Sequence, residues 1–235
     1  MWNGNSITFI FSLIAWGIIL SLVVFLYRKQ AEKATWWKII IAYFAGIFSF
    51  SITFTYFNEP VQLAILPLGL WILFAVLYQR NSWQKYRPYA WLGFGANFIF
   101  LLATLIASPL HQAVFPNNEL STFVSDLQQA HIITTHPSAS EFASLQSNAA
   151  AQIANAKKGV IQSHLWYNET IMTESDAKIE KFPYVLVGAA SKKGSGYHPT
   201  IYIEKDGKGI LIVTKQQHHY FLLSESILSE EVQHD

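Results

Sequence analysis

The chain has 235 residues, of which 51% are hydrophobic and only 13% charged, and it contains no cysteine. The absence of cysteine excludes a disulfide-stabilised domain, a zinc–thiolate site and a cysteine nucleophile. Residues 1–110 carry seven basic and two acidic side chains, whereas residues 111–235 carry nine basic and thirteen acidic ones. This division predicts a transmembrane domain over residues 1–110 and a polar domain over residues 111–235.

Four apolar segments in the first half predict a bundle of four transmembrane helices. The first segment lacks charge over twenty-one residues, which is enough for a helix to cross about 30 Å of hydrocarbon. It is expected to be a retained helix, because the basic pair Arg28-Lys29 follows the apolar run, whereas in a secretory signal the basic residues precede it. The shortest segment is the third, and Pro67 is expected to kink it. The predicted spans cover about residues 7–27, 39–57, 61–78 and 89–108.

The basic loops predict the orientation of this bundle. Residues 28–38 hold four Lys or Arg and residues 80–87 hold three, whereas the first six residues hold none. The positive-inside bias places both loops in the cytoplasm, so two spans must separate them, and the N-terminus and the C-terminal domain are expected outside. No predicted span contains Asp, Glu, Lys, Arg or His, which disfavours a proton pump or a voltage sensor.

Small residues at four-residue spacing mark the second segment, and one amide lies deep in the fourth. Ala42 and Gly46 form one line, and Ala45 and Ser49 form another. Such lines let helix backbones approach closely in lipid. Asn97 is expected to hydrogen-bond a neighbouring helix, with a ligand or ion contact as the alternative. These five residues are the predicted helix-packing positions.

The second half changes from helical to strand-like patterns. A helix is predicted over residues 119–130, and a second one begins at the capping box of Ser138 and Glu141 and ends at Gly159. An Asp206-Gly207 pair between two β-branched runs predicts a hairpin. We therefore expect a small α+β domain with a mostly antiparallel sheet. The predicted strands lie within residues 160–171, 184–190, 200–205, 209–215 and 219–223.

One loop in this domain is a candidate ligand site. Two lysines beside a glycine-rich turn could hold a phosphate or another polyanion. The loop lacks the spacing of a nucleotide-binding motif, and an ordinary strand connection is the competing interpretation. The candidate residues are Lys192, Lys193, Ser195, Tyr197 and His198.

All eight histidines lie in the second half, without a recognisable metal motif. His218 and His219 are neighbours that would point to opposite faces of a strand, and His131 and His136 are five residues apart. Scattered surface histidines or a pH-responsive role are the alternatives. No catalytic residue, cofactor site or metal site is predicted, and nucleic-acid binding is disfavoured by the acidic balance of the domain.

These observations favour a non-catalytic multi-pass protein of the cell membrane in a bacterial envelope. Its partners would be the lipid bilayer and a membrane or envelope protein that the outer domain binds or senses. Two alternatives stay open. One is an accessory subunit of a membrane transport or export complex, and the other is a membrane-bound enzyme acting on envelope or lipid substrates. The sequence determines neither the particular partner, nor the oligomeric state, nor the organism.

Overall fold

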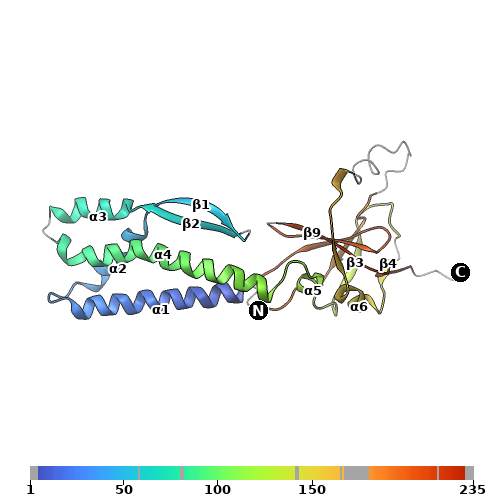
Figure 1. Cartoon of the computed structure of the whole chain (residues 1–235), viewed down its shortest axis with the longest axis horizontal. Helices are drawn as coiled ribbons and strands as arrows, with labels where there is room; N and C mark the ends of the chain where they lie inside the picture. The colour runs from blue at the N-terminus through green and yellow to red at the C-terminus, as the bar shows by residue number, and fades with distance from the viewer. Residues whose placement is uncertain are drawn as a thin grey trace. The chain divides into compact units, whose positions relative to one another are not determined.

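The computed structural model of the chain describes residues 5–57, 59–79, 82–140, 143–164, 166, 180–215 and 217–230. These residues form two compact units, one from Ser6 to His111 and one from Gln112 onward that includes Asn5. Figure 1 shows the helices and one hairpin of the first unit and the sheet of the second.

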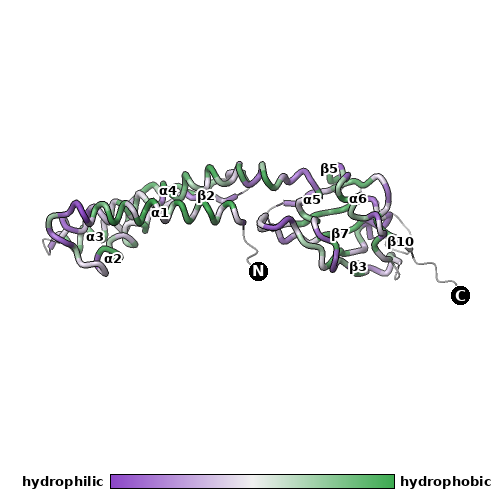
Figure 2. Tube along the Cα trace, turned by 90° about the horizontal axis from the view of Figure 1, so that it is seen from below, coloured by the Kyte–Doolittle hydropathy of each residue, from purple (hydrophilic) through white to green (hydrophobic). Residues whose placement is uncertain are grey.

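Among the described residues, two helices are long and apolar enough to cross a membrane, α1 (Ser6–Lys29) and α4 (Trp83–Val114). Hydrophobic residues colour much of both helices in Figure 2. Helix α4 continues past Pro109, where the sequence predicted its end. A proline removes a single helical hydrogen bond, so the turns on either side can carry the helix through it.

The second and third predicted helices are helical over only part of their length. Helix α2 covers Trp36–Ile47 and helix α3 covers Leu68–Tyr78. Between them lie the antiparallel strands β1 (Phe50–Tyr56) and β2 (Glu59–Leu66). The prediction of unbroken helices over residues 39–57 and 61–78 is therefore wrong along both strands.

The cause of this difference is local. From residue 50 to residue 56, aromatic or β-branched residues alternate with Ser and Thr, which is the period of a strand. On the returning side, Pro60 and Pro67 both lack the N–H that a helix interior requires. At the base of the hairpin, the Gly69 N–H of α3 donates a hydrogen bond of 2.8 Å to the carbonyl of Phe48, the residue that follows α2.

The second unit is built on an antiparallel sheet with the strand order β3-β6-β7-β8-β9-β5 among the described residues. Two short strands pair separately, β4 (Ala143–Leu145) with β10 (Leu228–Glu230). Two short helices, α5 (Leu120–Phe123) and α6 (Ala149–Ala154), also belong to this unit. The predicted α+β fold with an antiparallel sheet is confirmed. The strands of the main sheet are β3 (His131–Thr134), β5 (Lys157–Gly159), β6 (Tyr184–Val187), β7 (Thr200–Ile203), β8 (Gly209–Val213) and β9 (His218–Leu222).

The predicted helix from Ser138 to Gly159 is wrong over most of its described length. The Ser138 hydroxyl accepts a hydrogen bond from the Glu180 backbone N–H at 3.2 Å and lies 2.9 Å from Nδ1 of His136. A contact from a distant segment therefore occupies the oxygen that would have capped a helix. Glu141, the other half of the capping box, lies outside the described residues. The strand predicted from Val160 is also absent over the described residues 160–164.

One face of the main sheet forms the core of this unit. Successive side chains of a strand alternate between its faces, so every second residue of β7, β8 and β9 is buried. Helices α5 and α6 cover this face. The central buried side chains are Ile201, Ile203, Ile210, Ile212 and Phe221 with Leu120, Phe123 and Ile153.

Candidate functional site

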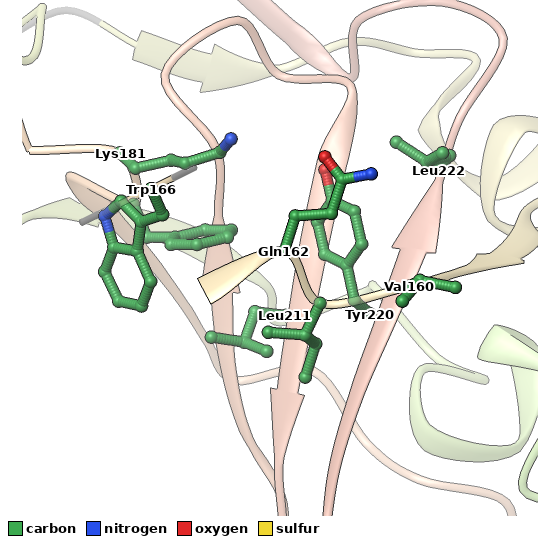
Figure 3. Close-up of a pocket in the computed structure, with 9 residues that line it drawn as sticks. Val160, Gln162, Trp166, Lys181, Leu211, Tyr220 and Leu222 are labelled. Atoms are coloured by element: carbon green, nitrogen blue, oxygen red, sulfur yellow. The ribbon is translucent and has the colours of Figure 1, made fainter. Parts of the chain in front are cut away.

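The other face of the sheet carries an apolar groove. Leu211 of β8 and Tyr220 and Leu222 of β9 point away from the core that Ile210 and Phe221 fill. Leu211 lies opposite Tyr220 in the strand register. The groove has a volume of about 330 Å³ (Figure 3). Six residues from the flanking segments complete its lining: Val160, Ile161, Gln162, Trp166, Lys181 and Phe182.

Three aromatic rings pack against one another along the groove. The centroids of Trp166 and Phe182 lie 5.5 Å apart with the rings nearly perpendicular, and Phe182 meets Tyr220 in the same edge-to-face manner at 6.2 Å. Such pairs gain about 0.5–1.5 kcal/mol beyond the area that they bury. The aliphatic rim is open to solvent, since Val160 is 79% exposed and Leu222 47%. The groove thus combines a wall of packed aromatic rings with exposed apolar surface.

A polar group adjoins the groove through two of its lining residues, Lys181 and Tyr220. The Tyr220 hydroxyl donates to Oε2 of Glu204 at 2.5 Å, and Nζ of Lys181 lies 3.2 Å from Oε1 of the same carboxylate. The Glu204 side chain is 17% exposed. Burial, the hydrogen bond and the carboxylate charge all raise the pKa of Tyr220. The phenol therefore keeps its proton at neutral pH, and both carboxylate oxygens have a partner, which leaves neither group disposed to act as a base or a nucleophile.

Gly209 makes room for this polar group. A Cβ atom at Gly209 would lie 1.8 Å from Oε2 of Glu204 and 2.6 Å from the Tyr220 hydroxyl oxygen. The backbone around it is tied by a hydrogen bond of 2.7 Å from the Glu204 N–H to the Gly209 carbonyl. A glycine at the start of β8 is therefore required for the contact between Glu204 and Tyr220.

The candidate ligand loop is folded by several of its own predicted binding residues. The Ser195 side chain is buried, and its Oγ accepts from the Tyr197 N–H at 3.3 Å. The Tyr197 ring packs on Phe123 with centroids 5.0 Å apart. Nζ of Lys192 lies 3.4 Å from the Val114 carbonyl and 5.7 Å from the centre of the Phe115 ring.

Lys193 and His198 are exposed members of the same loop. The loop, from Ala189 to Pro199, lines a hollow of about 620 Å³. Two glycines within it, Gly194 and Gly196, have φ angles of 83° and 72°, so the loop requires residues without a Cβ at both points. The contacts of Lys192, Ser195 and Tyr197 give the loop its shape, and the ligand assignment stays a prediction.

Ala42, Gly46 and Asn97 lie where α2 meets α4 in the first unit. Ala42 and Gly46 are buried, and a Cβ atom at Gly46 would lie 2.0 Å from the Ala90 carbonyl oxygen. Nδ2 of Asn97 lies 3.2 Å from the Ile47 carbonyl oxygen, to which it donates. These residues therefore make contacts within the chain itself.

Ala45 and Ser49 have different surroundings. A Cβ atom at Gly69 of α3 would lie 1.7 Å from the Ala45 carbonyl oxygen, so α3 passes close to α2 at this point. Ser49 follows the end of α2, and its hydroxyl lies 3.3 Å from that of Ser51. The second small-residue line consequently does not continue along a helix.

The histidines do not form a metal site in the described part of the chain, where no three His, Asp or Glu side chains come together. On β9, His218 is exposed and His219 is buried, as the alternation of a strand requires. The His219 ring stacks on Phe123 at 5.3 Å. Burial, with smaller effects of Lys158 and His218, lowers the pKa of His219.

Comparisons with protein-family models, with curated proteins and with solved structures give no match. The groove is therefore interpreted from its own geometry.

Sequence reasoning missed the groove, although a signal for it was present. Strand β8 reads Gly-Ile-Leu-Ile-Val and is apolar on both faces. A strand of this kind in an antiparallel sheet indicates that the second face is covered or binds something. The Lys181–Glu204–Tyr220 group had no such signal, because the three residues come from separate segments.

Proposed function

We propose that this chain is a non-catalytic multi-pass membrane protein of a bacterial envelope, whose C-terminal domain binds a partner through the apolar groove. The groove carries this proposal. Its aromatic rings pack against one another, its rim is exposed, and the polar groups beside it are engaged with one another. Uncovered apolar surface with rigid aromatic side chains is typical of interaction sites, and the engaged polar groups offer little for catalysis.

The long helices support the membrane location. At 1.5 Å per residue, α1 and α4 are about 36 Å and 48 Å long, which exceeds the hydrocarbon thickness of about 30 Å. Their outer surfaces are apolar: Phe25 of α1 and Leu102 of α4 are each more than half exposed. Such a surface is unfavourable in water and favourable against acyl chains.

Helices α2 and α3 are too short to cross alone, at about 18 Å and 17 Å. Strands β1 and β2 add about 23 Å and 26 Å respectively. Each helix with its strand is then long enough for one crossing. Four crossings keep residues 28–38 and 80–87 in the cytoplasm and both termini outside.

A hairpin at membrane depth needs polar groups beside its open edges. Side chains from α4 can serve this purpose, because Asn97 and Thr104 share a cavity of about 260 Å³ with Ser51 of β1 and Gln62 of β2. The proposed topology thus gives the hairpin a polar neighbour on the side of α4.

Single cysteines test this topology cleanly, because the natural chain has none. Lys38→Cys and Lys193→Cys would be treated in intact cells with a membrane-impermeant maleimide. We expect labelling at position 193 only, and labelling at position 38 after the cells are broken. Recovery of the chain in the soluble fraction, or labelling at position 38 in intact cells, would contradict the proposal.

A photoreactive residue tests the partner site. Placed at Val160 on the groove rim, it should give a discrete protein adduct in cells, whereas at Lys208 on an exposed turn it should not. Adding Phe182→Ala should weaken binding about thirtyfold, because a central aromatic anchor contributes about 2 kcal/mol. Equal adducts from both positions, or an adduct insensitive to Phe182→Ala, would refute the groove as the binding site.

The adduct also distinguishes the alternatives. A transporter or export component in the adduct would identify the chain as an accessory subunit. Turnover of an envelope substrate by the wild type, lost in Tyr220→Phe, would favour an enzyme instead.

A further inference from the structure

A second cavity lies in the first unit, at the end where the basic residues gather. It is formed between the C-terminal end of α1 and the N-terminal end of α4 and has a volume of about 200 Å³. The two helix ends are tied by Gln30, whose Nε2 donates to the Lys85 carbonyl at 2.7 Å and whose Oε1 accepts from the Tyr89 hydroxyl at 3.0 Å. These hydrogen bonds connect the two helix ends through two of the residues that line the cavity, Gln30 and Tyr89. Its lining consists of Leu26, Lys29, Gln30, Gln84, Pro88 and Tyr89.

The charge around this cavity is positive. Lys29 lines it, and Arg87 precedes Pro88 on α4 with an exposed side chain. Among the described residues, the acid paired at this end is Glu32, which lies 3.8 Å from Lys85, and no carboxylate pairs with Lys29 or Arg87. The first turn of α4 adds the positive end of a helix dipole. The cavity is therefore suited to an anionic group.

One residue that lines the cavity, Gln84, has a backbone carbonyl that the helix does not fully use. Pro88 has no backbone N–H, so the Gln84 carbonyl, one turn before it, lacks the donor that a continuous α-helix would supply. Gln84 is part of the cavity lining. A ligand that joins an anion to a hydroxyl could use both the cations and this oxygen.

The surroundings of the cavity are apolar on the side away from the basic loops. On α1, Leu22 lies one turn before Leu26. On α4, Trp91 lies two turns after Gln84, so both residues are on the side away from the basic loops. Leu22 and Trp91 are both exposed. A cationic mouth next to exposed apolar helix surface matches a molecule with an anionic head and hydrocarbon chains.

We infer that this cavity binds the head group of an anionic phospholipid, its phosphate held by Lys29 and Arg87 and a head-group hydroxyl directed to the Gln84 carbonyl. The acyl chains lie against the exposed apolar surfaces of α1 and α4. Basic pockets between helices on the cytoplasmic side of a membrane are suited to such head groups. This inference rests on the proposed membrane location, and it adds a ligand and a site to it.

The test uses the full chain purified in a mild detergent and titrated with dioleoylphosphatidylglycerol or dioleoylphosphatidylcholine, with bound lipid counted by native mass spectrometry. The wild type should prefer phosphatidylglycerol. Lys29→Gln and Arg87→Gln should each lower that affinity about fivefold, because a basic residue near an anionic lipid surface contributes about 1 kcal/mol. Affinity for phosphatidylcholine should not change.

Lys38→Gln is the matched control. It removes one charge from the same end of the unit, but Lys38 lies over the Trp37 ring on α2, a helix that contributes no residue to the cavity lining, whereas Arg87 is next to the lining residue Pro88. Its phosphatidylglycerol affinity should stay within twofold of the wild type. An equal loss in Lys38→Gln, or no head-group preference in the wild type, would overturn the site.

Two further outcomes separate the hypotheses. Displacement of phosphatidylglycerol by millimolar glycerol phosphate would show that a soluble anion is sufficient and would overturn the lipid assignment. A chain that fractionates with membranes but binds both lipids equally would overturn the cavity site alone, whereas a chain found in the soluble fraction would overturn the membrane location with it.

Discussion

Replacing Gly93 with alanine should separate two helices of the first unit. A Cβ atom at Gly93 of α4 would lie 2.0 Å from the Tyr43 carbonyl oxygen and 3.0 Å from the Gly46 Cα, both of which belong to the backbone of α2. Backbone atoms cannot rotate away, so α2 and α4 would have to move apart by about 1 Å, and overpacking of this kind costs about 1–3 kcal/mol. The rigid obstacle favours the upper end of that range.

Gly95 provides a control on the same helix. A Cβ atom at Gly95 would have no atom within 4 Å, so Gly95→Ala meets no obstacle and should stabilise α4 by about 0.5–1 kcal/mol through helix propensity alone. The two variants remove the same residue type and add the same methyl group. The difference in stability between the two variants therefore measures the contact between α2 and α4.

Thermal unfolding in detergent, followed by a change in helical circular dichroism, measures this difference. Gly93→Ala gains the same propensity, so the gap between the variants equals the packing cost of up to about 3 kcal/mol. At about 2–4 °C per kcal/mol for a chain of this length, Gly93→Ala should melt about 6–12 °C below Gly95→Ala. Melting temperatures within 1 °C of each other would refute the close crossing of the two helices.

Three further outcomes are expected in the second unit, each measured by thermal unfolding of the full chain. Tyr220→Phe removes the hydrogen bond to Glu204 and should cost about 1.5–3 kcal/mol, the usual range for a bond to a charged group, so an unchanged melting temperature would contradict it. Gly188→Ala should cost about 2–5 kcal/mol, because Gly188 has a φ of 80° and its Cβ would lie 2.1 Å from the Gln129 carbonyl oxygen; a neutral variant would refute this turn geometry. His219 should make stability depend on pH. Its folded pKa is lowered, so its contribution is present above about pH 6.5 and is lost as the pH falls from there through the lower folded-state value. His219→Asn should flatten that dependence, and a wild-type profile level from pH 7 to 5 would argue against a buried neutral ring.

Sequence patterns predicted some elements of the second unit correctly and others wrongly. In the second unit, the alternation around Asp206-Gly207 led directly to the hairpin of β7 and β8, because a turn with a positive φ at glycine and two β-branched runs are local features. The helix predicted to begin at Ser138 was wrong because a contact between distant segments, and not a local feature, decides the structure there. Its capping signal was correct locally, but the Glu180 N–H, forty-two residues further along the chain, takes its oxygen.

The groove illustrates a second limit. Its apolar floor could be suspected from Leu211, which stands between Ile210 and Ile212 in a strand that is apolar on both faces. The aromatic wall could not be predicted from the sequence, because Trp166 and Phe182 belong to segments that meet the strand only in the folded chain. Glu204 and Lys181 pair for the same reason, since their closeness depends on the sheet and not on their spacing.

The sequence by itself determined the division into an apolar, net basic half and a polar, net acidic half, and it determined the two long apolar helices, because composition and length are local properties. The alternation of residues 50–56 is a local signal for a strand, but only the tertiary structure decided that these residues pair with residues 59–66 in a hairpin. It also decided which small residues meet: Gly46 and Gly93 are far apart in the chain, and their backbones come into contact because neither carries a Cβ. The groove and the basic cavity exist for the same reason, since each is bounded by residues that only the packing of distant segments brings together.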